Sequence, residues 1–155
     1  GRGRLVHSAV PLDRTAQGGR RTEVTTSLWE VDPLAPDARR RIAELPGGGW
    51  FGDTVSPDGR AIALTRYVSA AESEVWLVDT ASGQRRRLLP AEGGAKAAHF
   101  AGGFSADGQA LFFTSDRDGE FMGLNRLDLA SGPRRSPPAV RRPPPRPHVP
   151  RRPVN

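Results

Sequence analysis

Histidines are the side chains of this chain best suited to bind a metal or to transfer a proton near neutral pH. The sequence holds three of them, His7, His99 and His148, and they lie far apart. No group of histidine and acidic residues has the spacing of a metal site, and cysteine is absent. The sequence therefore predicts no metal site, and we expect His99, just before Phe100, to begin a β-strand.

The acidic side chains that could act in catalysis or bind calcium stand in turn sequences. Asp116-Arg117-Asp118-Gly119 resembles the start of a calcium loop, but the later ligands and the final glutamate of such a loop are missing. Asp58 and Asp107 each precede a glycine, which is typical of a hairpin turn. Asp79 and Asp128 follow apolar segments, where an aspartate can accept backbone N–H bonds. We therefore predict structural roles for these aspartates.

The sequence also lacks the motifs of a serine nucleophile and of a phosphate-binding loop. The Gly-x-Ser-x-Gly elbow of serine hydrolases does not occur, and the nearest sequence, residues 103–107, lacks the second glycine. The glycines at 47–49 and 102–103 lack the Lys-Ser/Thr of a phosphate loop, so we interpret both as flexible connections. We predict no catalytic, cofactor-binding or metal-binding residue and no cofactor, and thus no enzymatic activity for this chain alone.

The elements that carry these turns repeat along the chain. Ser-x-Asp-Gly occurs at residues 56–59 and again 49 positions later at 105–108. Segments ending in Ala-Ser-Gly occur at 78–83 and, 49 positions later, at 127–132. A third copy is partial: Leu-Trp-Glu-Val-Asp at 28–32 precedes Val-Trp-Leu-Val-Asp at 75–79 by 47 positions. Repeats of this length indicate an array of like structural units.

Each repeat predicts four short β-strands. The 18 glycines and 15 prolines among 155 residues argue against a helical bundle. We expect one strand to end near Val55 and others at 61–67, 74–78, 85–89, 110–114 and 123–127. A four-stranded antiparallel unit of roughly 40–50 residues is typical of a β-propeller blade. We predict an all-β fold: a partial propeller in residues 1–132, with an incomplete blade over 1–46 and blades over 47–95 and 96–132.

Apolar faces of a blade stay uncovered until a neighbouring blade stacks on them. A closed propeller needs about four to eight blades, more than this chain supplies. Trp29, Trp50 and Trp76 could stack on a sugar or a base, but Trp29 and Trp76 hold equivalent repeat positions, which favours packing between blades. We expect Phe112 and Phe113 to lack a partner. Marginal stability and self-association, or dependence on further blades, should follow.

Positive charge is concentrated at the C-terminal end. The net charge of +6 arises from residues 133–155, which hold seven arginines, nine prolines and no acid. Proline at this density prevents helix and sheet, so we predict a disordered tail. Arg141, Pro144 and Pro147 have the spacing of a polyproline ligand, and the arginines could hold nucleic acid or anionic lipid weakly. We prefer an unstructured end, with no specific nucleic-acid partner, and no apolar run is long enough to span a membrane.

The repeats resemble the blades of TolB-like propellers and, more specifically, the N-terminal propeller of prolyl oligopeptidase family serine peptidases. The resemblance covers about residues 20–132 and is carried by the segments 27–33, 44–50, 56–60, 114–121 and 127–132. In that family the propeller gates access to a hydrolase domain that holds all three catalytic residues. The resemblance implies a non-catalytic fragment whose partners are the missing hydrolase domain and the remaining blades, with peptide substrate met only by the intact parent. The alternative is a fragment of a TolB-like protein-binding propeller without enzymatic activity.

The blade pattern stops after Gly132, where a fourth strand is expected. Lys96 is the only lysine against 22 arginines, which indicates a GC-rich gene. Out-of-frame reading of such DNA yields arginine, proline, alanine and glycine. We hypothesise that the tail follows a frameshift or a mispredicted gene end.

Overall fold

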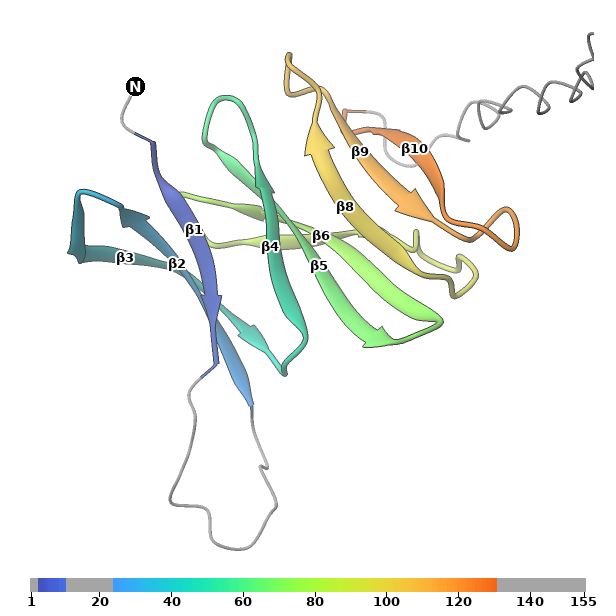
Figure 1. Ribbon diagram of the computed structural model, residues 1–155, viewed down its shortest axis with the longest axis horizontal. Coiled ribbons are helices and arrows are strands. Elements are labelled where there is room, and N and C mark those ends of the chain that lie inside the picture. The colour runs from blue at the N-terminus through green and yellow to red at the C-terminus, as the bar shows by residue number, and fades with distance from the viewer. Residues whose placement is uncertain (1–2, 11–23, 131–155) are drawn as a thin grey trace, which may run out of the picture.

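The computed structural model describes residues 3–10 and 24–130, and these residues form ten β-strands and no helix. The strands make three antiparallel sheets in which neighbours follow the chain order (Figure 1). The first blade contains β1 (Leu5–Ala9), β2 (Thr25–Asp32) and β3 (Ala35–Pro46). The middle blade contains β4 (Trp50–Val55), β5 (Ala61–Ser69), β6 (Glu72–Asp79) and β7 (Arg85–Leu89). The last blade contains β8 (His99–Phe104), β9 (Ala110–Ser115) and β10 (Gly123–Asp128). The prediction of an all-β fold is confirmed.

The predicted strands lie where the repeat indicated. β7 has the predicted bounds, and β5, β6, β9 and β10 extend one or two residues beyond theirs. The extra residues lie beside turns, where pairing continues past the apolar segment that marks a strand in the sequence. In β5 the ladder resumes after an irregularity between Tyr67 and Ser69. Strand existence therefore follows from apolar alternation, whereas the strand ends depend on turn geometry.

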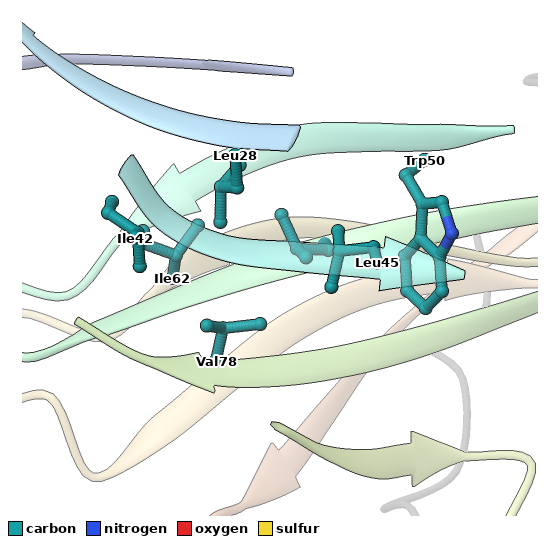
Figure 2. Close-up of a cluster of buried hydrophobic side chains, with 7 residues drawn as sticks. Leu28, Ile42, Leu45, Trp50, Ile62 and Val78 are labelled. Atoms are coloured by element: carbon teal, nitrogen blue, oxygen red, sulfur yellow. The ribbon is translucent and has the colours of Figure 1, made fainter. Parts of the chain in front are cut away.

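Two apolar clusters hold the three blades together. The first lies between the first and middle blades; Figure 2 shows Leu28 and Ile42 of the first blade close to Ile62 and Val78 of the middle blade. The second joins the middle and last blades through Ala63, Val75, Leu88 and Leu89 on one side and Leu111, Phe113 and Leu127 on the other. Each fully buried leucine, isoleucine or valine contributes about 1.5–3 kcal/mol. The core of this chain is thus interfacial, with none of the three sheets burying both of its faces by itself.

The expectation that Phe112 and Phe113 both lack a partner is wrong for Phe113. Phe113 is 3% exposed and packs in the second cluster, whereas Phe112 is 36% exposed. Successive residues of a strand point to opposite faces of the sheet. One phenylalanine therefore contacts the middle blade, and the other occupies the opposite face of the last blade.

The tryptophans follow the repeat in part. Trp76 packs against the first cluster, between the first and middle blades, and its ring meets the ring of Trp50 edge-on at 5.6 Å. Trp29 follows Leu28, which packs toward the middle blade, so Trp29 faces away from that interface. The guanidinium of Arg39 lies over the Trp29 ring at 4.6 Å. Packing between blades is confirmed for Trp76, while within the described residues no blade covers the side of Trp29.

The tail lies outside the described residues. The predictions for 133–155, including those for Arg141, Pro144, Pro147 and His148, are therefore not addressed by this structure. Within 3–10 and 24–130, no helix has the length and apolar character needed to cross a membrane.

Candidate functional site

The aspartates of the Ser-x-Asp-Gly repeats build turns. Ser56 Oγ donates to Asp58 Oδ1 at 2.6 Å and accepts from the backbone N–H of Ala61 at 2.9 Å. Ser105 and Asp107 repeat this arrangement, with the same 2.6 Å bond. The bond from the serine hydroxyl, followed by a bond from the backbone N–H two residues after the aspartate (Arg60 to Asp58 and Gln109 to Asp107), lowers the pKa of both aspartates. Both carboxylates are therefore engaged in turn formation, as the sequence predicted.

Asp79 and Asp128 differ although they hold equivalent positions. Asp79 Oδ1 accepts from the N–H of Ser82 at 2.7 Å, from its hydroxyl at 2.7 Å and from the N–H of Ala81 at 3.1 Å. These bonds lower the pKa of Asp79. Asp128 instead pairs with Arg126 at 3.1 Å, close to the last described residue. The structural role is confirmed for Asp79, and Asp128 takes part in an exposed ion pair.

The segment 116–119 forms a turn between β9 and β10, as its sequence predicted. The N–H of Gly119 donates to the carbonyl of Asp116 at 3.2 Å, and Asp116 Oδ1 accepts from the N–H of Ala98 at 2.8 Å. Asp118 pairs with its neighbour Arg117. Within the described ranges, no group of three or more histidine or acidic side chains is placed to hold a metal ion.

One glycine interpretation needs correction. Gly102 and Gly103 lie inside β8 at a register irregularity between Ala101 and Gly103, not in a connection between blades. A Cβ at Gly102 would stand 3.1 Å from the carbonyl oxygen of Phe112, so the absence of a side chain permits the bulge. The glycines at 47–49 do lie in the connection from β3 to β4.

His99 begins β8, as predicted, and is buried between the middle and last blades with 1% exposure. Its ring meets Phe113 edge-on at 6.2 Å, and neither ring nitrogen has a hydrogen-bond partner among the described residues. Burial lowers the pKa of His99, and the charge of Arg117 lowers it further, while Asp116 and Asp118 oppose both effects. Burial therefore favours the neutral imidazole in the folded chain. His7, by contrast, is half-buried in β1 opposite Trp29.

We expect this burial to make the chain less stable in mild acid. Because the pKa of His99 is lowered on folding, the unfolded chain takes up a proton at a higher pH than the folded chain, starting near pH 6.5. The contribution of His99 to stability should thus be constant well above that pH and decrease as the pH falls through it. In a His99→Phe variant the fall should be smaller, since phenylalanine cannot take up a proton. The matching position 49 residues earlier holds Trp50, so an aromatic side chain should pack at this position. Urea unfolding at pH 7 and pH 5 measures the difference, and an equal fall in both proteins would refute the role of His99.

The same arginine contact recurs at both blade interfaces. Arg40 Nη1 of the first blade donates to the carbonyl of Thr80 in the middle blade at 2.9 Å. Arg86 Nη2 of the middle blade donates to the carbonyl of Leu129 in the last blade at 3.5 Å. The two acceptors lie 49 residues apart, each just after an aspartate. These arginines were not predicted from the sequence, although Arg-Arg-Arg before an apolar residue, at 39–42 and 85–88, was a detectable repeat.

Buried hydroxyl groups join the middle and last blades. Ser73 Oγ donates to the carbonyl of His99 at 2.6 Å and accepts from the His99 N–H at 2.7 Å. Thr65 Oγ1 accepts from the N–H of Ala101 at 3.0 Å. Ser73 and Thr65 are both buried. These bonds satisfy backbone groups of β8 from the neighbouring blade, so they set how the two sheets are oriented.

The faces turned away from the middle blade carry exposed apolar side chains. Phe112 and Leu124 stand on the last blade, and Leu5 stands on the first. Within the described residues, no sheet covers either face (Figure 1). These two end faces are the candidate functional site, since most of the side chains that suggested chemistry in the sequence are committed to turns or to packing.

Repeated antiparallel sheets that stack through apolar faces define part of a β-propeller. The fold is similar to TolB from Acinetobacter baumannii, with a TM-score of 0.53 and 22% identity over 72% of this chain and 28% of that chain. A putative TolB from Agrobacterium tumefaciens is similar with a TM-score of 0.42 and 16% identity, over 70% of this chain and 55% of that chain. No protein-family model matches the sequence, and no curated protein matches it either. The predicted TolB-like propeller fold is thus confirmed, and the chain spans 28% of the length of the first of these proteins.

Proposed function

We propose that this chain is a non-catalytic segment of a TolB-like propeller that acts by binding other polypeptide through its end faces. One observation carries the proposal: Val75, which faces the last blade, is 0% exposed, whereas its counterpart Leu124 is 68% exposed. Monomeric proteins rarely expose contiguous apolar surface of this kind without a partner. The aspartates that the sequence offered as candidate carboxylates, Asp58 and Asp107, are used in turns, and so is Asp79.

Further blades are the proposed partners in a longer protein. A propeller closes with about four to eight blades, and the described residues form three sheets. The TM-score of 0.53 against 28% of the Acinetobacter TolB chain supports a segment of such a ring. In this proposal the segment contributes binding surface, and the ring around it supplies rigidity.

A propeller segment from a prolyl oligopeptidase family peptidase is the second candidate. It is supported by the sequence resemblance in segments 27–33, 44–50 and 114–121. In that case a hydrolase domain and the remaining blades would be the partners, and the propeller would gate peptide access in the intact parent. No residue of this chain would take part in bond cleavage.

The genomic DNA downstream of the Gly132 codon, read in all three frames, separates the two candidates. Further blade repeats without a Gly-x-Ser-x-Gly elbow would support the non-catalytic propeller. Blades followed by that elbow would overturn it in favour of the peptidase, and the expressed parent should then react with a fluorophosphonate probe. Neither blades nor an elbow in any frame would contradict both candidates.

A further inference from the structure

The three blades use the same two surfaces in the same order. Ladder pairs identify the equivalent positions: Thr65 pairs with Val75 in the middle blade, and Thr114 pairs with Leu124 in the last. Both pairs lie 49 residues apart, as do Ala63 and Phe112. In the middle blade these residues contact the last blade and are buried. We call the corresponding surface of the last blade, formed by Phe112, Thr114 and Leu124, the last-blade face.

The opposite surface can be traced in the same way. Leu5 pairs with Val31 and His7 with Trp29 in the first blade. Their counterparts in the middle blade are the pairs Ile62–Val78 and Leu64–Trp76, which pack against the first blade. In the last blade, Leu111–Leu127 and Phe113–Asn125 occupy these positions on the side of the middle blade. We call the surface formed by Leu5, His7, Trp29 and Val31 the first-blade face.

Exposed fractions differ between the end faces and their internal copies, although Val31 of the first-blade face is itself only 9% exposed. Phe112 is 36% exposed where Ala63 is 0% exposed, and Leu5 is 56% exposed where Ile62 is 0% exposed. Each internal interface joins one surface of the last-blade type with one of the first-blade type. Within residues 3–10 and 24–130, the first and last blades therefore each present one such surface that no other blade covers.

We propose that the last-blade face binds the first-blade face of a second copy of this chain, head to tail. This inference rests on the proposed function: for this chain by itself, a second copy takes the place that further blades would take in a longer protein. The pairing continues the interface already formed twice within the chain, with aliphatic and aromatic side chains on both sides. The Arg/Pro-rich segment 131–155 is a poor occupant, because seven arginines and nine prolines supply little apolar surface and few backbone donors.

Head-to-tail contacts generate a ring when the rotation closes and an open array when it does not. The described residues of each copy form three sheets, so two copies place twice that number around one axis, within the range of about four to eight that closes a propeller. The expected species is a dimer that uses both faces of each copy. Formation of larger arrays through the same faces would reflect a rotation that does not close.

Two single variants of the full chain test the pairing by complementation. Leu124→Glu disables the last-blade face, and Leu5→Glu disables the first-blade face. Both leucines are exposed in the single chain, so the variants should fold, as circular dichroism can verify. Each loses the burial of one leucine and gains a buried charge, and each should self-associate at least about tenfold more weakly in sedimentation velocity.

An equimolar mixture of the two variants should restore a one-to-one complex, because each brings the face that the other has lost. Phe121→Glu changes an exposed side chain between β9 and β10 that is not among the residues defining either face, and this variant should associate like the unmodified chain. Three results would overturn the inference. The unmodified chain could be monomeric, the mixture of the two variants could stay monomeric, or only one of the two variants could lose self-association. The last result indicates pairing of like faces.

The experiments distinguish a failure of the head-to-tail pairing from a failure of the proposed function. A mixture that stays monomeric, together with further blade repeats encoded downstream, would reject the second copy but retain the propeller segment. Complementation together with a downstream Gly-x-Ser-x-Gly elbow would retain the head-to-tail pairing. It would reject the proposal that the longer protein is a non-catalytic propeller.

Discussion

Replacement of Gly83 by alanine is expected to destabilise the chain by about 3 kcal/mol or more. Gly83 has a φ of +71°, a conformation that costs an L-residue about 1–2 kcal/mol. A Cβ there would also stand 2.5 Å from the carbonyl oxygen of Ile42 in the first blade. Relieving that clash would push the first and middle blades apart, which adds about 1–3 kcal/mol for overpacking. Urea unfolding followed by tryptophan fluorescence measures the loss.

Gly59→Ala is the matched control. Gly59 has nearly the same φ, +72°, but a Cβ at that position would meet nothing within 4 Å. The control should therefore lose only the conformational part, about 1–2 kcal/mol. Equal losses in the two variants would show that the close approach of the two blades at Gly83 contributes nothing to stability.

Replacement of Ser73 by alanine is expected to cost about 2–4 kcal/mol. The Ser73 hydroxyl satisfies both the N–H and the carbonyl of buried His99, at 2.7 and 2.6 Å. Without it, two buried backbone groups lose a partner, and each unsatisfied group costs about 1–3 kcal/mol. The last blade should detach first, so amide hydrogen exchange in β8 should accelerate more than exchange in β2.

Ser8→Ala provides the comparison for Ser73. The Ser8 hydroxyl makes one bond across the first interface, to the carbonyl of Trp50 at 3.1 Å, and is only half-buried. Its loss should be about 1 kcal/mol or less. A smaller effect for Ser73→Ala than for Ser8→Ala would contradict the assignment of Ser73 as the main polar link between the blades.

The glycine and serine positions illustrate what local sequence can reveal. Asp-Gly turns, apolar alternation and the 49-residue repeat were sufficient to locate β5, β6, β7, β9 and β10. The turn roles of Asp58, Asp79 and Asp107 also followed, because an aspartate bonds to backbone groups two or three residues away. Nothing local marked Ser73, whose partner His99 is 26 residues distant and in another sheet.

The candidate site likewise combines features that the sequence revealed with features that it did not. The repeat indicated that blades would be missing neighbours, but it assigned Phe112 and Phe113 alike to the uncovered surface. Only one of two successive strand residues can face a given side, and the sequence alone did not decide which one. The recurring bonds from Arg40 and Arg86 to the following blade were also invisible, because they join residues 40 and 43 positions apart.

The fold class, the repeat unit and the turns could be predicted from sequence, because they depend on interactions within a few residues of one another. The covered face of each sheet could not be predicted in this way. That choice depends on how one sheet lies against the next: it buries Val75 and Phe113, leaves Leu124 and Phe112 exposed on the last blade, and so creates the faces through which this chain is proposed to bind.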